Sequence, residues 1–583
     1  MRPFDHPLSG VAGGGGGAVD VWPYEIGHSA LLDGASSLQF TPAAVGNRRQ
    51  FALVLSLKIS ALPNVYNTLF SVFADSNNRF AFWLTEAGKL HVFDRSGGVT
   101  RMELKTDAEC VDTTNHFTLG LFVDTTQATE SERVRLFVNG TRIISFSSET
   151  YPAQNYDTNL FTTVEHVLGA YNGTYNINGN LSAVHLVEGV ADMPDFGGFS
   201  SVVSGLWVPQ AYTGGYGANG SHPDFADAAN LGKDASGNGN DWTVSGALSQ
   251  SDDTPAHNGG VAAWRALPEP DVLDPATGVA VVLRDGTGAA GSVGGLAFGP
   301  DSVLTKDRYN TRSWCLQDTV RGPENCLFTD LTNAEDVKPG AIPAFNADGY
   351  DLGNQSITND LGSSYIDLCL KRGPEFGFDI VSGINHTSGT PTPFDHALDD
   401  SVEFGFVRRL DDVDHWWLFH RDLGADKYLC LNLTQAATTS AGFWAVNTST
   451  QFCVPSSLGT GIYAAYLFRS VPGFSKVFSY TGNNPVDGPF ADLGFTPLAM
   501  MLKNADGSDD WQFSDSARDP YNPVEWTLRP NEADVEYQYS DRYRYLSNGF
   551  KITDNSGGQV NGAGNLYVGI AWAAQPFKYS NAF

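Results

Sequence analysis

Positive charge is scarce in this chain of 583 residues: 35 Lys and Arg stand against 65 Asp and Glu, for a formal net charge of −30. No basic stripe is present that would neutralise a phosphate backbone, so we expect no nucleic-acid partner. The excess of negative charge favours solubility and repels anionic membranes. We interpret it as a solvated acidic surface, with recruitment of divalent cations as the alternative.

Long apolar runs and paired cysteines are also missing. No stretch approaches the roughly 18 apolar residues that a membrane-spanning helix requires, so we expect no membrane insertion. The first twenty residues contain no apolar signal core, so we expect synthesis in the cytoplasm without Sec-type secretion. Six cysteines are scattered without metal-knuckle spacing, and we expect all of them to be reduced and mostly buried.

The most informative pattern that is present is a repeat of about a hundred residues in the C-terminal half. Three times, a basic residue precedes a Trp by eight positions, and a later Tyr precedes a Pro by nine. The landmarks are Lys306, Trp314, Tyr365 and Pro374; then Arg409, Trp417, Tyr463 and Pro472; then Lys503, Trp511, Tyr567 and Pro576. Duplicated modules build length and multivalent surface, whereas a catalytic centre normally occurs once. The repeat therefore favours a structural or binding protein over an enzyme.

Turn residues and alternating apolar stretches predict an all-β protein. The chain has 63 glycines, and between about Val21 and Val190 seven or more short strands follow one another, bounded by Gly, Asn, Asp or Pro. Asn139-Gly140 is the strongest hairpin signal, because this pair readily adopts the positive φ angles of a type I′ turn. Such a succession of strands without helices is typical of a two-sheet sandwich.

Several segments carry a resemblance to known families. The order of SALLDGASSLQFTP, VDTTQATESERVRLFVNGTRI and GNLSAVHLVEG is similar to that of the laminin-G/concanavalin-like jelly roll. From about Tyr24 to Pro255, DTTQATESERVRLFVNG, ETYPAQNYDTN, WVPQAYTGGYGANG and DASGNGNDWTV resemble, more narrowly, bacteriophage virion proteins of the tail or tail fibre. In the repeats, VPGFSKVFSYTGNNPVDGPFADLGFTP, SARDPYNP and YLSNGFKI resemble the C-terminal module of the same phage proteins.

These patterns divide the chain into six expected parts. They are a flexible Gly-rich arm at 1–20, a laminin-G/concanavalin-like sandwich with a C-terminal extension at 21–258, a connector at 259–299, and repeat modules at 300–393, 398–491 and 492–583. The expected fold is thus an all-β concanavalin-like jelly roll followed by three tandem β-rich modules. The arm, with its glycines at 13–17, is either a docking segment that orders on a larger assembly or an unstructured tail.

One metal site is a candidate. Asp234, Asn238, Asn240 and Asp241 lie in the run DASGNGNDW, and oxygens of Asp and Asn at alternating positions can ligate Ca²⁺. The run lacks the bidentate Glu of an EF-hand, so an Asx/Gly turn is the favoured alternative. We expect no other cofactor.

The repeated tryptophans are candidates for stacking on sugar rings. Trp314, Trp417 and Trp511 offer aromatic faces of the kind that lectins use, although a Trp at equivalent positions of β-repeats is more often part of the core. We predict that the three residues occupy equivalent, mostly buried positions in superimposable modules.

Acid–base pairs follow the first and third of these tryptophans. Asp318 with Arg321 and Asp515 with Arg518 form either a ligand clamp or an ion pair that fixes a loop; the second copy departs from the pattern. No G-x-S-x-G elbow or H-E-x-x-H motif is present, and carboxylates are too numerous for a glycosidase pair to be singled out. No catalytic residue is assigned.

The resemblance implies a bacteriophage virion structural protein of the tail-fibre or host-adhesion type, made in the host cytoplasm and located in the tail. We expect non-catalytic binding of a host surface glycan or protein, with avidity raised by copy number. The N-terminal region is expected to attach to other tail proteins and the repeats to face outward, in a homo-oligomer for which a trimer is the first expectation. The alternatives are a polysaccharide-degrading tailspike, a head-decoration or other purely structural virion protein, and a secreted lectin.

Overall fold

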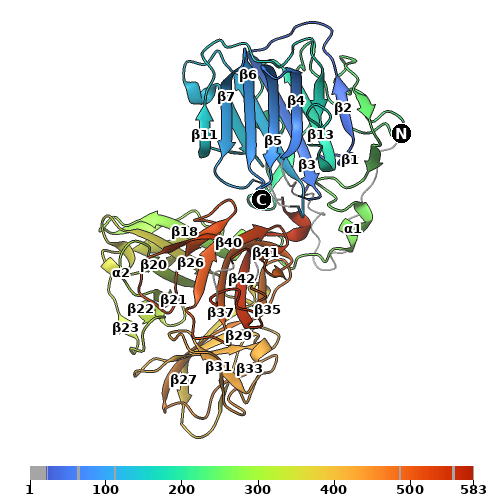
Figure 1. Cartoon of the computed structure of the whole chain (residues 1–583). Helices are drawn as coiled ribbons and strands as arrows, with labels where there is room; N and C mark the ends of the chain where they lie inside the picture. The colour runs from blue at the N-terminus through green and yellow to red at the C-terminus, as the bar shows by residue number, and fades with distance from the viewer. Residues whose placement is uncertain are drawn as a thin grey trace.

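The protein is all-β and consists of a sandwich joined to a second body that contains the repeats (Figure 1). The computed structural model describes residues 21–22, 24–61, 66–110, 113–484, 487–554 and 558–581. The Gly-rich arm expected at residues 1–20 lies outside them. None of the helices in the described part of the chain has the length and apolarity that crossing a membrane requires.

Two antiparallel sheets form the N-terminal sandwich. One sheet has the order β10 (Thr141–Arg142), β9 (Val134–Val138), β8 (Phe117–Asp124), β3 (Gln50–Ile59), β13 (Asn178–Glu188), β1 (Ser29–Asp33) and β17 (Ser249–Ser251). The other has the order β11 (Phe146–Thr150), β7 (Val99–Thr106), β6 (Leu90–Ser96), β5 (Asn78–Thr85), β4 (Tyr66–Asp75), β12 (His166–Leu168), β2 (Ser37–Phe40) and β16 (Thr243–Ser245). The hairpin predicted at Asn139-Gly140 is confirmed, with φ angles of 47° and 77° between β9 and β10.

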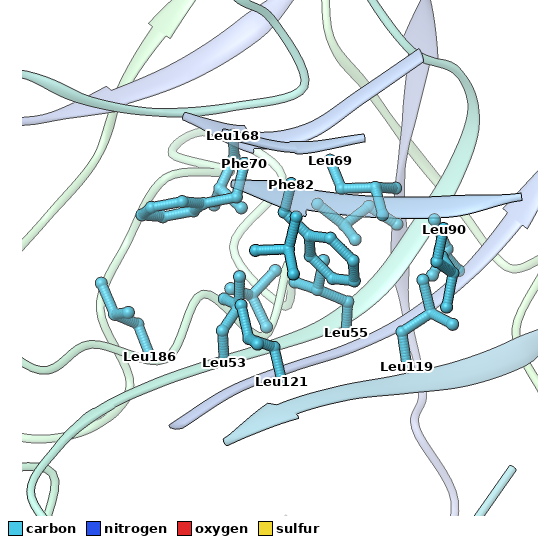
Figure 2. Packing of buried hydrophobic residues seen from close by; sticks show 14 of the residues in the cluster. Leu53, Leu55, Leu69, Phe70, Phe82, Leu90, Leu119, Leu121, Leu168 and Leu186 are labelled. Atoms are coloured by element: carbon cyan, nitrogen blue, oxygen red, sulfur yellow. The ribbon is translucent and has the colours of Figure 1, made fainter. Parts of the chain in front are cut away.

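The core of the sandwich lies between the facing sides of the two sheets (Figure 2). Leu53 and Leu55 of β3 meet Phe70 and Phe82 of the opposite sheet. Strand β3 is apolar at almost every position because its other face is also covered, where Val54 belongs to a second cluster with Phe122, Phe196 and Trp207. A strand that is buried on both faces does not show the alternation of apolar and polar residues that is typical of a half-exposed strand.

The three repeats share one strand order. In each sheet the four strands lie side by side in the same order. A first strand comes before the strand that contains the landmark Tyr. The strand of the basic residue follows, and a strand at the Trp comes last. These are β18 (Val279–Asp285), β26 (Ser364–Leu370), β20 (Ser302–Asp307) and β21 (Cys315–Asp318); β27 (Phe378–His386), β34 (Gly461–Phe468), β29 (Phe404–Arg409) and β30 (Trp416–His420); β35 (Ser475–Thr481), β42 (Leu566–Pro576), β37 (Phe495–Asn504) and β38 (Gln512–Asp515).

The remaining strands and helices complete the fold. They are β14 (Gly197–Phe199), β15 (Trp207–Pro209), β19 (Gly291–Val293), β22 (Gly322–Phe328), β23 (Asp336–Val337), β24 (Phe345–Asn346), β25 (Gly349–Leu352), β28 (Thr392–Asp395), β31 (Lys427–Cys430), β32 (Thr438–Thr439), β33 (Gln451–Val454), β36 (Phe490–Asp492), β39 (Val524–Thr527), β40 (Tyr537–Leu546), β41 (Gly549–Ile552), α1 (Val261–Ala266) and α2 (Ser356–Asn359). Single 3-10 turns are η1 (Glu130–Glu132), η2 (Met193–Asp195), η3 (Pro275–Thr277), η4 (Pro374–Phe376), η5 (Arg421–Leu423) and η6 (Phe577–Tyr579).

The first strand of every module lies before the boundary expected from the landmarks. Strand β18 falls in the expected connector 259–299, β27 in the expected first module, and β35 in the expected second. Each of these strands pairs forward, with the Tyr strand of the following copy. Pro374 and Pro472 therefore stand where the chain leaves one module and enters the next, and Pro576 stands at the end of the third module. The period is as predicted, but the phase differs by about twenty residues.

The modules close into a ring instead of extending in a line. In each module one buried indole donates a hydrogen bond to a backbone carbonyl of another module. The bonds run from Trp314 to Arg529 (2.8 Å), from Trp416 to Phe328 (2.8 Å) and from Trp511 to Cys430 (3.1 Å). Because the first module bonds to the third, the cycle is complete and has threefold pseudo-symmetry. One apolar cluster with residues from all three modules fills the centre.

Trp416, and not Trp417, is the counterpart of Trp314 and Trp511. Trp416 is fully buried, whereas Trp417 is partly exposed and donates to the carboxylate of Asp414. The prediction of equivalence is confirmed for Trp314 and Trp511 and wrong for Trp417. The second copy contains two adjacent arginines and two adjacent tryptophans, so the spacing of eight fits both registers. The pleat decides between them, since a shift of one residue moves a side chain to the other face.

The ring is docked against the sandwich through its last residues. The amide of Asn115 donates to the carbonyl of Ser580 at 2.5 Å, and the side chain of Asn581 accepts from the backbone N–H of Trp207 at 2.8 Å. Tyr579 packs in one apolar cluster with Trp22. Residues near both ends of the described chain, Trp22 and Tyr579, thus meet at the junction between the two bodies.

Candidate functional site

A cleft on the outer face of the seven-stranded sheet contains the most concentrated group of ligand-binding chemistry that we find. Two adjoining cavities, of about 170 and 620 Å³, both border Tyr24, His185 and His222. Strand β13 supplies His185 from the floor, and the loop at residues 211–218 forms one wall. We call the group Tyr24, His185, Tyr212, Tyr216 and His222 the His/Tyr cleft.

The rings of the cleft are arranged in nearly parallel planes. The imidazoles of His185 and His222 stack with centroids 4.2 Å apart and an interplanar angle of 10°. The ring of Tyr216 lies 6.1 Å from that of His185 at 16° and 5.9 Å from that of His222 at 12°. Tyr212 stacks on Phe196 at 4.6 Å and 7°. Such an ordered set of flat faces is formed before any ligand arrives.

Hydrogen bonds orient the two imidazoles of the cleft. Nδ1 of His222 lies 2.7 Å from the carbonyl oxygen of Val184 and must donate to it, because a carbonyl oxygen can only accept. Nδ1 of His185 lies 2.7 Å from the hydroxyl of Tyr216. Burial, together with the neighbouring His222, holds the pKa of His185 well below its ordinary value. Burial also raises the pKa of the Tyr216 phenol, so Tyr216 and His185 are both uncharged at neutral pH.

Glycines shape the wall that carries Tyr212 and Tyr216. Gly217 has a φ of +72°, and a Cβ there would lie 2.3 Å from the carbonyl oxygen of Glu188. A Cβ at Gly220 would lie 1.9 Å from the carbonyl oxygen of Tyr216. Both contacts are too close for any larger residue.

The calcium candidates brace this wall. The carboxylate of Asp234 accepts backbone N–H groups of His222 (2.8 Å), Ser236 (2.9 Å) and Asn240 (2.9 Å). Burial would raise the pKa of Asp234, but these donors outweigh it and lower the pKa. Asp241 accepts the backbone N–H of Asp234 at 2.8 Å.

The two asparagines of the same run tie down the glycines. The Asn238 amide donates to the carbonyls of Gly217 and Gly220, and the Asn240 amide to those of Ala218 and Gly220, at 2.6–2.9 Å. The run is thus an Asx/Gly turn that orients His222. In the described ranges no three His, Cys, Asp or Glu side chains gather as a metal site would require. Calcium binding stays a prediction.

Of the candidate tryptophans from the sequence, only Trp417 is partly exposed, and sugar stacking on it stays a prediction. The remaining candidates lie inside the ring. Trp314 and Trp511 are 1% and 0% exposed, so no sugar can stack on them in this conformation. The ion pairs Asp318–Arg321 (2.6 Å) and Asp515–Arg518 (2.7 Å) are buried as well.

Both Asp residues of these pairs also fix the loop that follows them. Asp318 accepts the backbone N–H groups of Val320 and Arg321, and Asp515 that of Arg518. They therefore fix loops, which was the alternative to a clamp.

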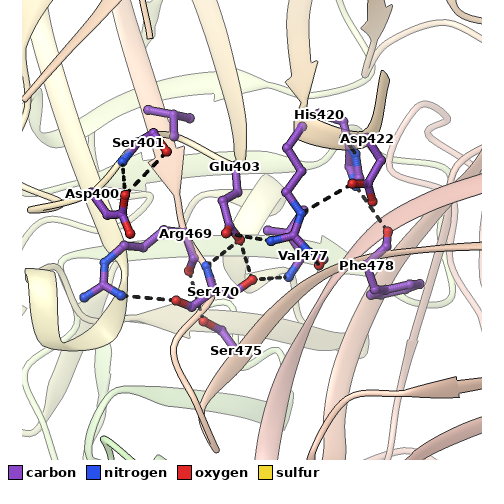
Figure 3. Close-up of polar contacts among 12 residues, drawn as sticks. Asp400, Ser401, Glu403, His420, Asp422, Arg469, Ser470, Ser475, Val477 and Phe478 are labelled. Carbon is purple, nitrogen blue, oxygen red and sulfur yellow. Dashed lines mark hydrogen bonds and ion pairs between the residues drawn. The ribbon is translucent and has the colours of Figure 1, made fainter. Parts of the chain in front are cut away.

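His420 takes the place of these aspartates in the second module (Figure 3). It stands four residues after Trp416, and its Nδ1 accepts the backbone N–H of Asp422 at 3.1 Å. Arg421 pairs with Glu403 at 2.6 Å and donates to the carbonyl of Val477 in the third module. In the second copy, His420 and Arg421 thus hold the loop after the Trp strand and contact the next module, although the Asp and Arg of the other two copies are replaced.

All six cysteines are free and buried. The sulfurs of Cys315 and Cys326 lie 2.8 Å apart on neighbouring strands, and burial raises the pKa of Cys315 well above its ordinary value.

The sequence alone did not reveal His185 or His222, because neither belongs to a motif with characteristic spacing. The only local signal is the segment YTGGYGANGSH, in which two tyrosines and four glycines precede His222.

Three solved structures illustrate the known proteins to which the chain is similar. The mouse laminin alpha1 chain domains LG4-5 are 11% identical over 78% of this chain and 92% of that chain, with a TM-score of 0.24. The CBM40 of the Ruminococcus gnavus IT-sialidase bound to alpha2,3 sialyllactose is 18% identical over 29% and 94%, with a TM-score of 0.22. The SAP-like pentraxin from Limulus polyphemus is 14% identical over 30% and 80%, with a TM-score of 0.22. Values this low indicate nothing about ligand or activity.

No curated protein matches the chain in sequence. A family model described as "Domain of unknown function (DUF7483)" matches residues 274–576. The match begins at η3 and ends with the last residue of β42, so it covers the three-module ring and leaves out the sandwich. Because the match spans more than half of its length, the chain belongs to the DUF7483 family.

Proposed function

We propose that this protein is a bacteriophage virion protein of the tail-fibre or host-adhesion type, and that its His/Tyr cleft binds a host surface glycan without cleaving it. The resemblance of residues from about Tyr24 to Pro255 to phage tail proteins supports the placement in a virion. The parallel array of imidazole and phenol rings in the cleft carries the proposal of a glycan ligand.

The chemistry of the cleft suits a sugar in two respects. Flat faces such as that of Tyr212 pack against the C–H side of a pyranose ring. Hydroxyl groups of the sugar need hydrogen-bond donors and acceptors, which the imidazole of His222 and the hydroxyl of Tyr24 supply. A volume of about 620 Å³ lies within the usual range of small-ligand sites, roughly 300–1,000 Å³.

The non-catalytic part of the proposal rests on the composition of the floor. Glycoside hydrolysis uses two carboxyl groups that flank the scissile bond, whereas the groups that line both cavities in common are a phenol and two imidazoles. The carboxylates of Glu25 and Asp224 lie at the border of the smaller cavity. They are the residues to replace when the alternative of a polysaccharide-degrading tailspike is tested.

We thereby propose that the receptor-binding surface lies on the sandwich. The sequence had led us to expect it on the repeats. The buried position of Trp314 and Trp511 favours a structural role for the ring. For the oligomeric state and the partners we propose a homo-oligomer, with a trimer as the first expectation, that attaches to other tail proteins.

The cleft is tested by binding of the full chain to purified host-surface polysaccharide. Tyr212→Ala should weaken binding roughly three- to tenfold, since one aromatic stacking contact contributes about 0.5–1.5 kcal/mol. Tyr309→Ala, which removes a 60% exposed ring in the first module, is the matched control. Equal affinity of the two variants would contradict the cleft as the site.

Two further measurements separate the alternatives. Release of reducing sugar that disappears in Glu25→Gln or Asp224→Asn would establish a tailspike enzyme instead of an adhesin. A reconstruction of the intact particle that places the chain on the head would leave the purely structural alternative standing.

A further inference from the structure

The outer face of the eight-stranded sheet is a second surface with unusual chemistry. No strand or helix crosses in front of β5, β6 and β7 in Figure 1. On this side, β5 and β6 place three cross-strand pairs in succession: Arg79 with Arg95, Ala81 with Phe93, and Trp83 with His91. This face lies on the sheet opposite to the one that carries the His/Tyr cleft.

The first pair brings two positive charges together without neutralising them. Like charges directly opposite one another destabilise a sheet. The Nε atoms of Arg79 and Arg95 are both buried and lack a hydrogen-bond partner. Glu103, the carboxylate on the neighbouring strand, instead binds His91 (3.0 Å) and Ser148 (2.9 Å).

Within the described ranges, therefore, neither arginine has an ion-pair partner. That is unexpected in a chain with a net charge of −30, which has acidic side chains in excess. Arg79 interacts with the hydroxyl of Tyr171, which carries no charge to balance it. Both arginine side chains are partly exposed, so an anion from outside the chain can pair with the accessible part of each guanidinium group, which binds carboxylate and sulfate-like oxygens.

An aromatic platform continues from the arginines along the same strands. The indole of Trp83 contacts the rings of Phe93 (4.9 Å), Tyr171 (5.3 Å) and Tyr66 (4.7 Å), and Tyr175 is 42% exposed beside them. Nε1 of Trp83 and Nδ1 of His91 are further buried polar atoms without a hydrogen-bond partner. Unpaired buried polar atoms are rare in folded proteins and call for a ligand or water.

The geometry points to a binding site for an anionic polysaccharide, with carboxylated or sulfated sugars held by Arg79 and Arg95 and neighbouring sugar rings stacked at Trp83. Arg79 and Trp83 are four residues apart on one strand, or about 13 Å, which suits a polymer better than a single ion. This inference goes beyond the proposed function, since it uses another face and another class of ligand.

The test uses the full chain and three immobilised polymers: heparin as the sulfated one, polygalacturonate as the carboxylated one, and dextran as the neutral one. We expect retention on one or both anionic polymers and none on dextran. The variant Arg79→Gln/Arg95→Gln should bind at least tenfold more weakly, while its thermal stability should not fall, because a repulsive pair has been removed. Arg135→Gln/Arg142→Gln is the control, since it removes two arginines from the opposite sheet.

The outcomes separate the proposal from its rivals. Equal retention of the two double variants, or equal binding to dextran, overturns it. Should the first double variant fail to fold, the single variant Arg95→Gln and the exposed Arg101→Gln replace it under the same criterion. If the wild-type chain binds no polymer but self-associates, and Arg79→Gln/Arg95→Gln is monomeric, a second copy is the occupant and the proposal fails. Tyr212→Ala should bind the anionic polymers normally, so failure of the cleft and failure of this face are distinguishable.

Discussion

Replacing Trp416 by Phe tests whether the three modules form one closed body, and the adjacent Trp417 provides the matched control. Both residues are tryptophans of β30, and both donate through Nε1. Trp416 donates across a module boundary to the carbonyl of Phe328, from a site with no solvent exposure. Trp417 donates within its own module to Asp414, from a partly exposed site.

The magnitudes follow from these environments. Trp416→Phe removes a buried hydrogen bond, about 0.5–1.5 kcal/mol, and leaves a small void, which adds about 1 kcal/mol. We therefore expect a loss of about 2 kcal/mol in the free energy of unfolding. Trp417→Phe removes a bond that water can replace, and its expected cost is below about 1 kcal/mol. The difference is large relative to the error of a denaturation measurement.

The assay is equilibrium unfolding of the full chain in urea, followed by far-ultraviolet circular dichroism so that the loss of a fluorophore does not matter. In a closed ring, Trp314→Phe and Trp511→Phe should cost about as much as Trp416→Phe, because the three indoles make equivalent bonds. An equal or larger loss for Trp417→Phe would refute both the register assigned to the second module and the role of the indoles in closing the ring.

Three further predictions concern the ring, the buried histidines and the wall of the cleft. Deletion of residues 472–583 should unfold the remaining two modules, as seen by proteolysis, because they share one core with the third; a fragment that melts like the full chain would indicate independent modules. Burial lowers the pKa of His166 and of His420 to about 4, below the ordinary value of 6.5. Because the unfolded chain takes up protons before the folded one, the contribution of each histidine to the free energy of unfolding is complete above about pH 6.5 and is lost as the pH falls toward about 4. The loss reaches up to about 3 kcal/mol for each residue. Urea unfolding between about pH 7 and pH 4.5 checks this, and a flat profile would contradict it. Asp234→Ala should cost about 1–3 kcal/mol and weaken glycan binding at the cleft, whereas Ser236→Ala, which removes one of its donors, should cost less.

The fold class and the period of the repeat could be predicted because they depend on local patterns. Turn residues mark the ends of strands, and Asn139-Gly140 specifies its hairpin through backbone conformation alone. The register of the second module could not be predicted in the same way. Adjacent arginines and tryptophans satisfy the spacing of eight twice, and only burial on the pleat separates Trp416 from Trp417.

The candidate site could not be predicted because its parts are joined by tertiary contacts. His185 lies in the middle of an apolar strand, and His222 follows a glycine-rich loop; neither pattern indicates a ring stack. The run from Asp234 to Trp242 was recognised as rich in oxygen ligands, yet its carboxylate and amides are directed at backbone groups of the loop it supports. The residue types predicted that this run can form many hydrogen bonds, whereas the fold determined which groups are its partners.

Closure of the ring changes what the repeats contribute to function. Tandem modules in a line would add reach and would present the same surface three times. Here the counterparts that recur, Trp314, Trp416 and Trp511, point inward and bind neighbouring modules, so these repeated residues supply a shared core. Residues near both ends of the described chain meet at the junction with the sandwich. Under the proposed adhesin role, we therefore expect multivalent attachment to come from several copies of the chain. Each copy would present one sandwich with two chemically different faces: stacked imidazole and phenol rings on one sheet, and arginines without an ion-pair partner among the described residues on the other.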